Sequence, residues 1–421
     1  MNRGRNGRAF IWSKDLQKMN FSKKILLCGL FLLAGLACDS SSLVSQVLTA
    51  VPLTPTPAFS TDATLAPLPK GAIQEIPMQV GYGARGSFYE VYFTDPFNPE
   101  AYRDEGGPDA PLVQAIDGAR VSVDVAAYSL DLRSVRDALL RAQKRGIEVR
   151  MVMENTNLLD AAPQALLAAG IPIVGDDAAS LPAATLEATP EATPEAASNG
   201  LMHDKFVVID RSEVWTGSMN FTTSGAYEDN NNLVRIRSAR AAEDYTVEFE
   251  EMFKRHFFGE DTIDRTPYHH LTVDGVPLEI YFSPDDHVAS HILDLLRRAQ
   301  HSIYFMAYSF TTVDFGDLLI QKARAGVDVS GVMEADQIKS NEGTRFTPFQ
   351  DAHLPVYQDG NEGQMHHKVF ILDEKIVITG SYNFSASAET TNDENVIIFF
   401  DPQIASQYLA EFKRVEAEAQ K

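Results

Sequence analysis

The chain has 421 residues, of which 44% are hydrophobic, so its length suits two or three domains with ordinary cores. It carries 36 Lys and Arg against 58 Asp and Glu, a formal net charge of −22. That balance disfavours avid non-specific binding to nucleic acid, which needs a basic surface. The two cysteines, Cys28 and Cys38, lie near the N-terminus, which excludes a disulfide framework or a cysteine metal site from the body of the protein.

The N-terminal residues are typical of a bacterial export signal. Lys23 and Lys24 precede an apolar run over residues 25–37, too short for a membrane-spanning helix, which needs about 20 residues. Residues 35–38 resemble a lipobox, except that Gly35 stands where leucine is usual. We therefore expect a signal peptide over residues 1–37 and a lipid-modified Cys38 that anchors the chain to the outer face of a bacterial membrane. Whether translation starts at Met1 or Met19 stays open.

The mature chain is predicted to be more acidic still, with a tether at its start. Residues 1–37 hold seven Lys and Arg and one acid, so the remainder has 29 basic and 57 acidic residues, a formal net charge of −28. Residues 38–77 are rich in Ser, Thr and Pro, which predicts a disordered tether. The folded region is expected to begin at Met78.

From there the chain repeats itself, which predicts two similar halves, residues 78–258 and 270–421. Apolar β-branched and aromatic runs recur in the same order, at residues 90–93 and 279–282, 121–129 and 302–309, and 146–154 and 326–334. Helical spacing of apolar residues follows at 135–144 and 315–325. Strands that alternate with helices indicate an α/β fold, with one mixed sheet in each half and helices on its faces.

The halves differ by a low-complexity stretch rich in Ala, Thr and Pro over residues 175–199, absent from the second half. It predicts a disordered surface loop, either a passive insertion or a lid, directly before the first motif described below.

Two copies of one motif dominate the folded region. His203, Lys205 and Asp210 recur as His366, Lys368 and Asp373, each set followed by a strand-like apolar run and then by Gly-Ser-x-Asn. The later positions are Ser218 and Asn220 in the first copy and Ser381 and Asn383 in the second. Two histidines can divide nucleophilic attack and proton transfer on a phosphodiester. The lysines would neutralise the phosphate oxygens, and Asn220, Asn383, Ser218 and Ser381 would donate hydrogen bonds.

This chemistry needs no metal or other cofactor, and none is predicted elsewhere. His269 and His270 are expected in a loop without carboxylates at ligand spacing.

Residues 78–421 resemble the phospholipase D superfamily, whose hallmark is the duplicated H-x-K-x-x-x-x-D motif. The resemblance implies that the halves are related by a pseudo-twofold axis with both histidines at their interface. The implied catalytic residues are His203, Lys205, Asn220, His366, Lys368 and Asn383, whereas Asp210 and Asp373 would be structural.

One difference between the motifs bears on the roles of the histidines. Eleven residues after the motif asparagine, the second half has Glu394 and the first has Asn231. In relatives a carboxylate here orients a catalytic histidine of the other half, which implies that Glu394 supports His203 as nucleophile and leaves His366 as general acid and base. The alternative is that Asn231 is tolerated drift.

The substrate stays open between two classes. The resemblance implies a metal-independent phosphodiesterase with a phosphohistidine intermediate and no obligate protein partner. Phospholipase D-type hydrolysis of phospholipid head groups is favoured by the predicted anchor and the acidic charge. The alternative is an endonuclease, because the region after Gly380 looks most like small bacterial endonucleases and mitochondrial cardiolipin hydrolases. An inactive phosphate-binding surface protein is a third reading.

Overall fold

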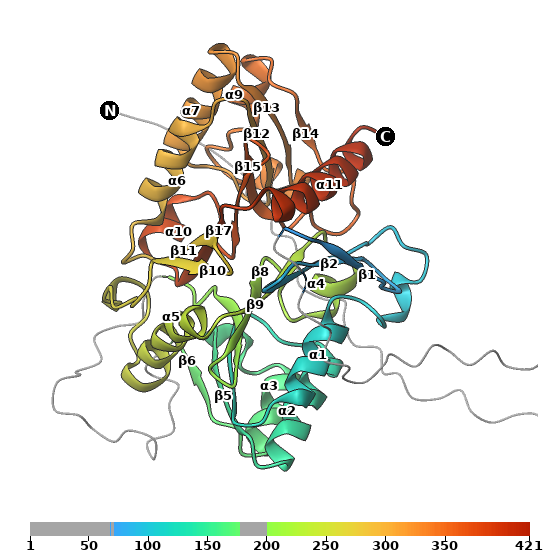
Figure 1. The fold of residues 1–421 in the computed structure, drawn as a ribbon, viewed down its shortest axis with the longest axis vertical. Helices are drawn as coiled ribbons and strands as arrows, with labels where there is room; N and C mark the ends of the chain where they lie inside the picture. Colours follow the sequence, from blue (N-terminus) through green and yellow to red (C-terminus); the bar gives the residue numbers. More distant parts are fainter. Residues whose placement is uncertain (1–67, 69–70, 177–199) are drawn as a thin grey trace, which may run out of the picture. The chain divides into compact units, whose positions relative to one another are not determined.

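The structure is a computed structural model that describes residues 68, 71–176 and 200–421 (Figure 1). The predicted signal peptide, Cys38 and residues 177–199 lie outside the described residues, as does most of the predicted tether, so these predictions are not tested. No helix in the described ranges is both long and apolar enough to cross a membrane.

The first half is built on a mixed sheet with the strand order β1-β2-β3-β9-β8-β7-β4-β5-β6. The pairs β4–β5 and β5–β6 are parallel and the others are antiparallel. The strands are β1 (Gln74–Ile76), β2 (Tyr82–Arg85), β3 (Tyr89–Phe93), β4 (Ser122–Ala127), β5 (Glu148–Met153), β6 (Ile173–Gly175), β7 (Lys205–Ile209), β8 (Glu213–Gly217) and β9 (Asn232–Arg237). The helices and helical turns are η1 (Ala101–Arg103), α1 (Asp109–Gly118), α2 (Arg133–Lys144), η2 (Asn155–Asn157), α3 (Ala161–Ala168), α4 (Thr223–Tyr227), α5 (Ala239–Glu250), η4 (Glu251–Arg255) and η5 (Gly259–Asp261).

The second half repeats this topology with the strand order β10-β11-β17-β16-β15-β12-β13-β14. Again only β12–β13 and β13–β14 are parallel. Its strands are β10 (His270–Val273), β11 (Val276–Ser283), β12 (Ser302–Ala307), β13 (Asp328–Met333), β14 (Val356–Gln358), β15 (Lys368–Leu372), β16 (Ile376–Gly380) and β17 (Glu394–Phe399). Its helices are α6 (Val288–Arg298), α7 (Val313–Arg324), α8 (Ala335–Ser340), α9 (Phe346–Asp351), α10 (Ala386–Thr390) and α11 (Pro402–Ala419). The predicted pair of mixed α/β halves is confirmed.

Three hydrophobic cores hold these layers together. One core joins the outer face of the first sheet to α1, α2 and α3, and a second joins the outer face of the second sheet to α6, α7 and α9. The third contains the inner faces of both sheets and the apolar sides of α5 and α11. Because that inner core is shared, the described residues of both halves form one compact unit, and burial of the same apolar surface stabilises both.

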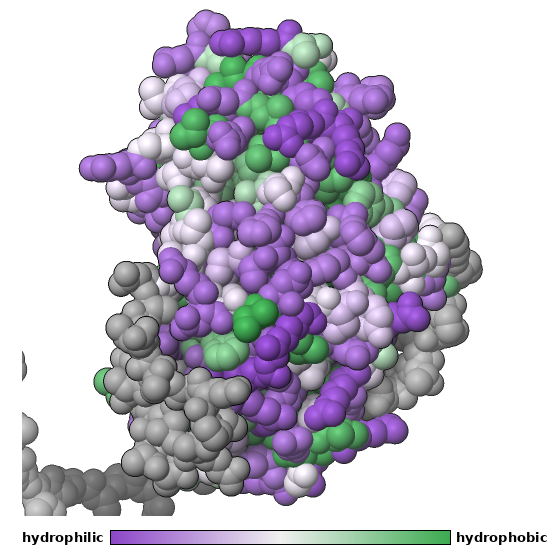
Figure 2. All heavy atoms as spheres, turned by 90° about the vertical axis from the view of Figure 1, so that its left-hand side faces the viewer, coloured by the Kyte–Doolittle hydropathy of each residue, from purple (hydrophilic) through white to green (hydrophobic). Residues whose placement is uncertain are grey.

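The helices and strands follow from the apolar pattern of the sequence. In α2 the buried residues Val135, Ala138, Leu139 and Ala142 are spaced by three and four positions, which places them on the side that faces the sheet. In β7 and β15 every residue is buried, as expected of a central strand covered on both faces. On the face at the left of Figure 1, hydrophilic residues predominate and apolar ones are scattered (Figure 2).

Three predicted boundaries or loops are wrong. The fold begins before Met78, because β1 pairs with β2 from Gln74 onward. The insertion begins after position 175, because Gly175 ends β6 and the Asp176 carboxylate accepts hydrogen bonds from the backbone N of Asn155 (2.8 Å) and Met202 (3.0 Å). His270 is the first residue of β10 rather than part of a loop.

Candidate active site

Each histidine motif begins at the same edge of its sheet and is held there by the other half. Ala127 pairs with Lys205 and Ala307 with Lys368, so the end of one strand lies beside the start of the motif strand. The backbone N of His203 donates to the carbonyl of Asp393 (3.0 Å), and that of His366 donates to the carbonyl of Asn230 (2.9 Å). Each motif therefore contacts the residues that directly precede the last strand of the other half, which is β17 for His203 and β9 for His366.

His203 lies against the carboxylate predicted from the sequence. Its Nδ1 is 2.7 Å from Oε2 of Glu394, and both side chains are buried. Burial, together with the nearby Lys205 and Lys368, lowers the pKa of His203 well below its usual value. Burial raises the pKa of Glu394 to about 7. When Glu394 is ionised it accepts a hydrogen bond from Nδ1–H of a neutral His203, which leaves the Nε2 lone pair free for bond formation.

His366 is oriented in the same way by neutral groups. Its Nδ1 is 3.0 Å from Oδ1 of Asn231 and 3.1 Å from the carbonyl O of Ser218. A carbonyl oxygen only accepts, so Nδ1 carries the proton and Nε2 is again the free nitrogen. Burial, followed by Lys368 and Lys205, lowers the pKa of His366. The two histidines thus match in tautomer but differ in the charge of the group behind them.

The motif lysines lie beside the histidines and against two aromatic rings. Lys205 Nζ donates to the carbonyl of His203 (2.7 Å) and lies 5.2 Å from the ring centre of Tyr128. Lys368 Nζ donates to the carbonyl of His366 (2.9 Å) and lies 4.6 Å from the ring centre of Tyr308. Burial lowers the pKa of Lys205 to about 8 and that of Lys368 well below its usual value. An anion placed beside these two buried lysines would favour their charged forms, so together they form a binding place for an anion.

The tyrosines themselves were missed by sequence reasoning. Tyr128 packs edge-on against His203 with ring centres 5.0 Å apart, and Tyr308 packs against His366 at 4.5 Å. The repeated Ala-Tyr-Ser that begins at the last residue of β4 and of β12 was visible in the sequence. Nothing there linked it to a histidine about sixty or more residues away.

The turn after the next strand carries the motif asparagines, two residues beyond Ser218 and Ser381, and the Ser218 carbonyl lies against His366. Gly217 and Gly380 both have φ of +148°, and a Cβ there would lie 2.3 Å and 2.1 Å from backbone oxygens, so only glycine fits. Asn220 and Asn383 follow, and their Oδ1 atoms are buried without a hydrogen-bond partner among the described residues. Side-chain amides left with unused hydrogen-bonding groups in a buried site suit contact with a bound ligand.

Ser218 and Ser381, which were predicted to contact substrate, are both fully buried and already paired. Ser218 Oγ donates to Asn231 Oδ1 (2.8 Å) and accepts from Asn232 N and Nδ2 (3.0 and 3.2 Å). That uses every hydrogen bond a hydroxyl can make. Ser381 Oγ accepts from Asn395 N and Nδ2 (3.0 and 3.4 Å) and hydrogen-bonds Glu394. Both serines support the groups that orient the histidines.

Two further asparagines tie the halves together, and sequence reasoning missed them too. Asn395 Nδ2 donates to Asp204 Oδ1 (2.6 Å), and Asn232 Nδ2 donates to Nδ1 of His367 (3.1 Å). Each contact joins the middle residue of one motif to the last strand of the other half. Their Oδ1 atoms accept from equivalent threonine and tyrosine hydroxyls, namely Thr216 and Tyr245 for Asn395, and Thr379 and Tyr408 for Asn232.

Asp210 and Asp373 are placed away from the histidines, in the turns after β7 and β15. Their carboxylates accept only backbone N–H groups in the described hydrogen bonds, from residues 120–122 and 300–302 respectively. Burial would raise the pKa of Asp373, but these N–H donors hold it below its usual value. Both carboxylates therefore join the motif strand to the start of its neighbour.

The expectation that His269 lacks carboxylate neighbours is wrong. Its Nε2 is 3.3 Å from Asp264 Oδ1, and its Nδ1 is 3.6 Å from Asp286 Oδ2. These three residues form a separate cluster outside the histidine site.

The chain also matches a known family over most of its described length. The family model for the cardiolipin synthase PLD-like domain matches residues 112–253 and 292–416, together more than half of the chain and once in each half. The chain belongs to the phospholipase D superfamily.

Individual relatives of this superfamily match single stretches of the chain. The phospholipase D of Rickettsia typhi is 35% identical over 128 residues, 30% of this chain and 62% of the relative. The mitochondrial cardiolipin hydrolase of Chlamydomonas reinhardtii is 29% identical over 126 residues, 30% of this chain and 56% of the relative. The chain thus spans less than two thirds of the length of either relative.

A solved structure with the same fold covers both halves. The phosphatidylserine synthase of Haemophilus influenzae Rd KW20 aligns with a TM-score of 0.54 and 13% identity, over 73% of this chain and 83% of that one. At this identity the likeness concerns the fold alone.

Proposed function

We propose that this phospholipase D superfamily member is a phosphodiesterase that acts through a phosphohistidine on His203. The observation that carries the proposal is that one buried site holds two histidines with free Nε2 atoms, one backed by Glu394 and the other by neutral Asn231. The difference in backing charge makes His203 the stronger nucleophile, because an ionised Glu394 stabilises the positive charge that develops on the ring during attack.

In the first step the phosphate lies between Lys205 and Lys368. His203 Nε2 attacks phosphorus, the bond from phosphorus to the leaving oxygen breaks, and protonated His366 gives its Nε2 proton to that oxygen. His366 must be protonated for this role, and the lysines and burial oppose that in the free protein. The negative charge of a bound phosphodiester offsets the lysines, so substrate binding itself promotes the required protonation.

In the second step His366, now neutral, accepts a proton from water. The resulting hydroxide attacks the phosphohistidine, the P–N bond breaks, and a phosphomonoester leaves. Asn220 and Asn383 would donate their amide N–H groups to the phosphate oxygens, where charge increases as the transition state forms. Every proton and charge in the cycle is handled by groups within this site, so the cycle requires no metal.

We further propose phospholipid as the substrate class. The two curated relatives described above are named for lipid hydrolysis. The formal charge of −22 opposes loose binding to a long polyanion. Buried acids lie near the site, with Asp229 acting on Lys368, Glu154 on Tyr128 and Glu334 on Tyr308. Their charge disfavours the approach of a second phosphate. A lipid anchor at Cys38, itself a prediction, would hold the site beside a bilayer.

The substrate test is turnover by the purified full-length chain in the presence of EDTA. The substrates are vesicles of phosphatidylcholine, phosphatidylethanolamine or cardiolipin, and single- and double-stranded DNA. We expect release of head groups and a residual phosphomonoester lipid. Cleavage of DNA with no lipid turnover would instead assign the endonuclease reaction, and loss of all activity in EDTA would contradict a mechanism based on histidine alone.

The roles of the histidines are separated with an activated diester, bis(p-nitrophenyl) phosphate, whose leaving group needs no proton. His203→Ala and His366→Ala should each lower steady-state turnover at least about a thousandfold. His366→Ala should nevertheless release a burst of nitrophenol and carry a phosphoryl adduct on His203, seen by mass spectrometry. An adduct on His366 in the His203→Ala variant would reverse the assignment. His301→Ala, which alters an exposed histidine, serves as the control.

A further inference from the structure

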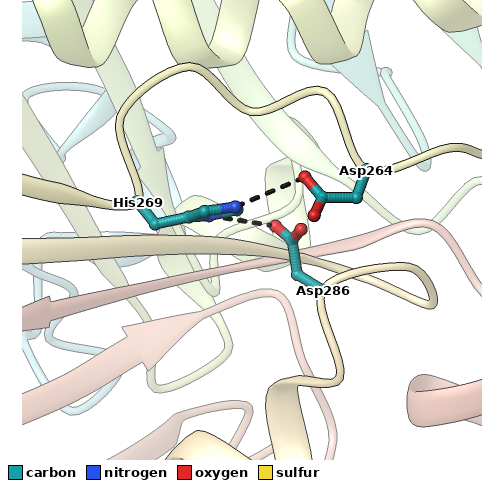
Figure 3. Close-up of side chains that lie close together, drawn as sticks. All are labelled: Asp264, His269 and Asp286. Carbon is teal, nitrogen blue, oxygen red and sulfur yellow. Dashed lines mark ion pairs between the residues drawn. The ribbon is translucent and has the colours of Figure 1, made fainter.

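The cluster of Asp264, His269 and Asp286 lies outside the histidine site and has no part in the proposed reaction. Asp264 and His269 belong to the segment that connects η5 of the first half to β10 of the second. Asp286 lies in the turn between β11 and α6. Figure 3 shows the two carboxylates facing each other, with the edge of the imidazole ring beside both.

The imidazole of His269 is held by contacts on its other atoms. Nδ1 lies 3.2 Å from the carbonyl O of Ile280, to which it donates, and the ring stacks on Tyr281 with centres 5.5 Å apart and planes 20° apart. A histidine that donates one N–H to a backbone carbonyl presents the lone pair of its other nitrogen, as metal-binding histidines do. Here that nitrogen is Nε2, which points toward Asp264.

Asp286 provides an independent indication that this cluster binds a ligand. Its side chain is only 1% exposed. Oδ2 accepts from the backbone N of Phe282 (2.8 Å), whereas Oδ1 is buried and has no hydrogen-bond partner among the described residues. An unpaired carboxylate oxygen in a buried position is costly, and a second carboxylate opposite adds repulsion. A protonated His269 would balance one of the two charges but would leave Oδ1 unpaired.

Few other positive charges are available to this cluster. The neighbouring Asp285 adds a further acid, and Arg265 forms an ion pair with Glu251 at 3.2 Å. Among the described residues, the acids at this cluster therefore outnumber the cations.

We propose that Asp264, His269 and Asp286 bind one zinc-like divalent transition-metal ion. One imidazole nitrogen and two carboxylate oxygens form a mixed ligand set that suits zinc better than calcium or magnesium, which favour oxygen ligands only. The 3.3 Å between Nε2 and Asp264 Oδ1 is close to the edge of about 3.4 Å in a tetrahedron with bonds of about 2.0–2.1 Å. Water would complete the coordination, because the side chain of Asp264 is 59% exposed.

Such an ion would fasten the connecting segment to the second half. The turn η5, which precedes that segment, is already held in place, because the backbone N of Gly259 donates to Asp393 Oδ1 (2.6 Å), next to Glu394. With an ion at its other end, the segment would be fixed at both ends against the half that supplies Glu394. The ion is therefore structural, and its loss should lower thermal stability without stopping the proposed reaction at low temperature.

The test combines metal content with thermal unfolding of the full-length chain, purified with its affinity tag removed and treated with EDTA. Addition of Zn²⁺ should restore one equivalent per chain and raise Tm by about 3 °C or more, whereas Mg²⁺ and Ca²⁺ should not. Asp264→Asn, whose exposed side chain makes misfolding improbable, should bind Zn²⁺ at least about tenfold more weakly and lose the Tm shift. Asp286→Asn should likewise bind Zn²⁺ more weakly and lose the Tm shift.

The matched control is His270→Gln, which changes the adjacent histidine, 73% exposed and paired with Glu279 at 3.4 Å. It should keep both the zinc stoichiometry and the shift. Zinc binding that is unchanged in Asp264→Asn, or a Tm that does not respond to Zn²⁺ in the unaltered chain, would overturn the proposal. Because hydrolysis in EDTA at low temperature is measured separately, failure of the metal site and failure of the phosphodiesterase proposal are distinguishable.

Discussion

The pH dependence of the proposed hydrolysis follows from two ionisable groups beside His203, namely Glu394 and Lys205. Glu394 supports His203 only as a carboxylate, and its raised pKa of about 7 means that this form is populated above that pH. Lys205 binds phosphate best as a cation, and its lowered pKa of about 8 means that the charge is lost above that pH. For bis(p-nitrophenyl) phosphate, whose leaving group needs no proton from His366, kcat/KM should therefore rise through pH 7, peak between about 7 and 8, and fall above.

Glu394→Gln should remove the acidic limb of this profile and lower kcat/KM about a hundredfold or more, since the remaining amide orients His203 but does not stabilise its charge. The measurement is initial-rate hydrolysis of bis(p-nitrophenyl) phosphate between pH 5 and 9. Glu342→Gln, at an exposed glutamate, should keep both limbs. An acidic limb that persists in Glu394→Gln would show that another group titrates there.

The same residues show what the sequence could and could not reveal. Glu394 was recognisable because it lies eleven residues after Asn383, where the equivalent position of the first half holds the neutral Asn231. Ser218 looks like a substrate contact in the sequence because it lies beside a catalytic motif, and only the structure shows that its hydroxyl already makes three hydrogen bonds. Tyr128 and Tyr308 give no chemical signal in sequence, since their role depends on which rings they contact.

At the scale of elements, the helices and strands with strong hydrophobic patterns were predictable from the sequence, whereas short polar strands at a sheet edge were not. The strands after each motif and the helices α2 and α7 lie where the apolar spacing indicated. In contrast β1 has only three residues, Gln-Glu-Ile, at the edge of the sheet, and its pairing with β2 rather than its own composition makes it a strand. The crossing contacts of Asn232 and Asn395 likewise depend on tertiary packing.

The turns after the two motif strands should carry measurable stability. In Asp373→Ala three backbone N–H groups lose their acceptor, which should cost about 1–2 kcal/mol at pH 7, because these groups are partly open to water. The folded-state pKa of Asp373 lies below its unfolded value of about 3.9, so its stabilisation is present above about pH 4 and is lost as the pH falls through the folded value. Denaturant unfolding at pH 7 and pH 3 measures both effects.

The control for this prediction is Asp351→Ala, at an exposed position that ends α9, which should change stability by less than about 0.5 kcal/mol. Hydrolysis by Asp373→Ala at low temperature should stay near that of the unaltered chain. A large loss of kcat with stability unchanged would mean that Asp373 acts on the histidine site rather than on the turn.

At the scale of the whole molecule, the site exists because one chain crosses its own pseudo-twofold axis repeatedly. His203 meets Glu394 and Asp204 meets Asn395, each pair 191 residues apart, while His366 meets Asn231 across 135 residues. The inner core that α5 and α11 share with both sheets is formed by the same chain. Each half therefore completes the site only together with the other half of the same chain.

This arrangement predicts that two inactive variants do not rescue each other. In an equal mixture of His203→Ala and His366→Ala, an intact pair of histidines could arise only if halves were exchanged between chains, which would disrupt the shared inner core. The mixture should show no more diesterase activity than the mean of its components. A mixture of the unaltered chain with the double variant should keep half of the specific activity. Recovery of about a quarter of the activity in the first mixture would show that the site is assembled between chains.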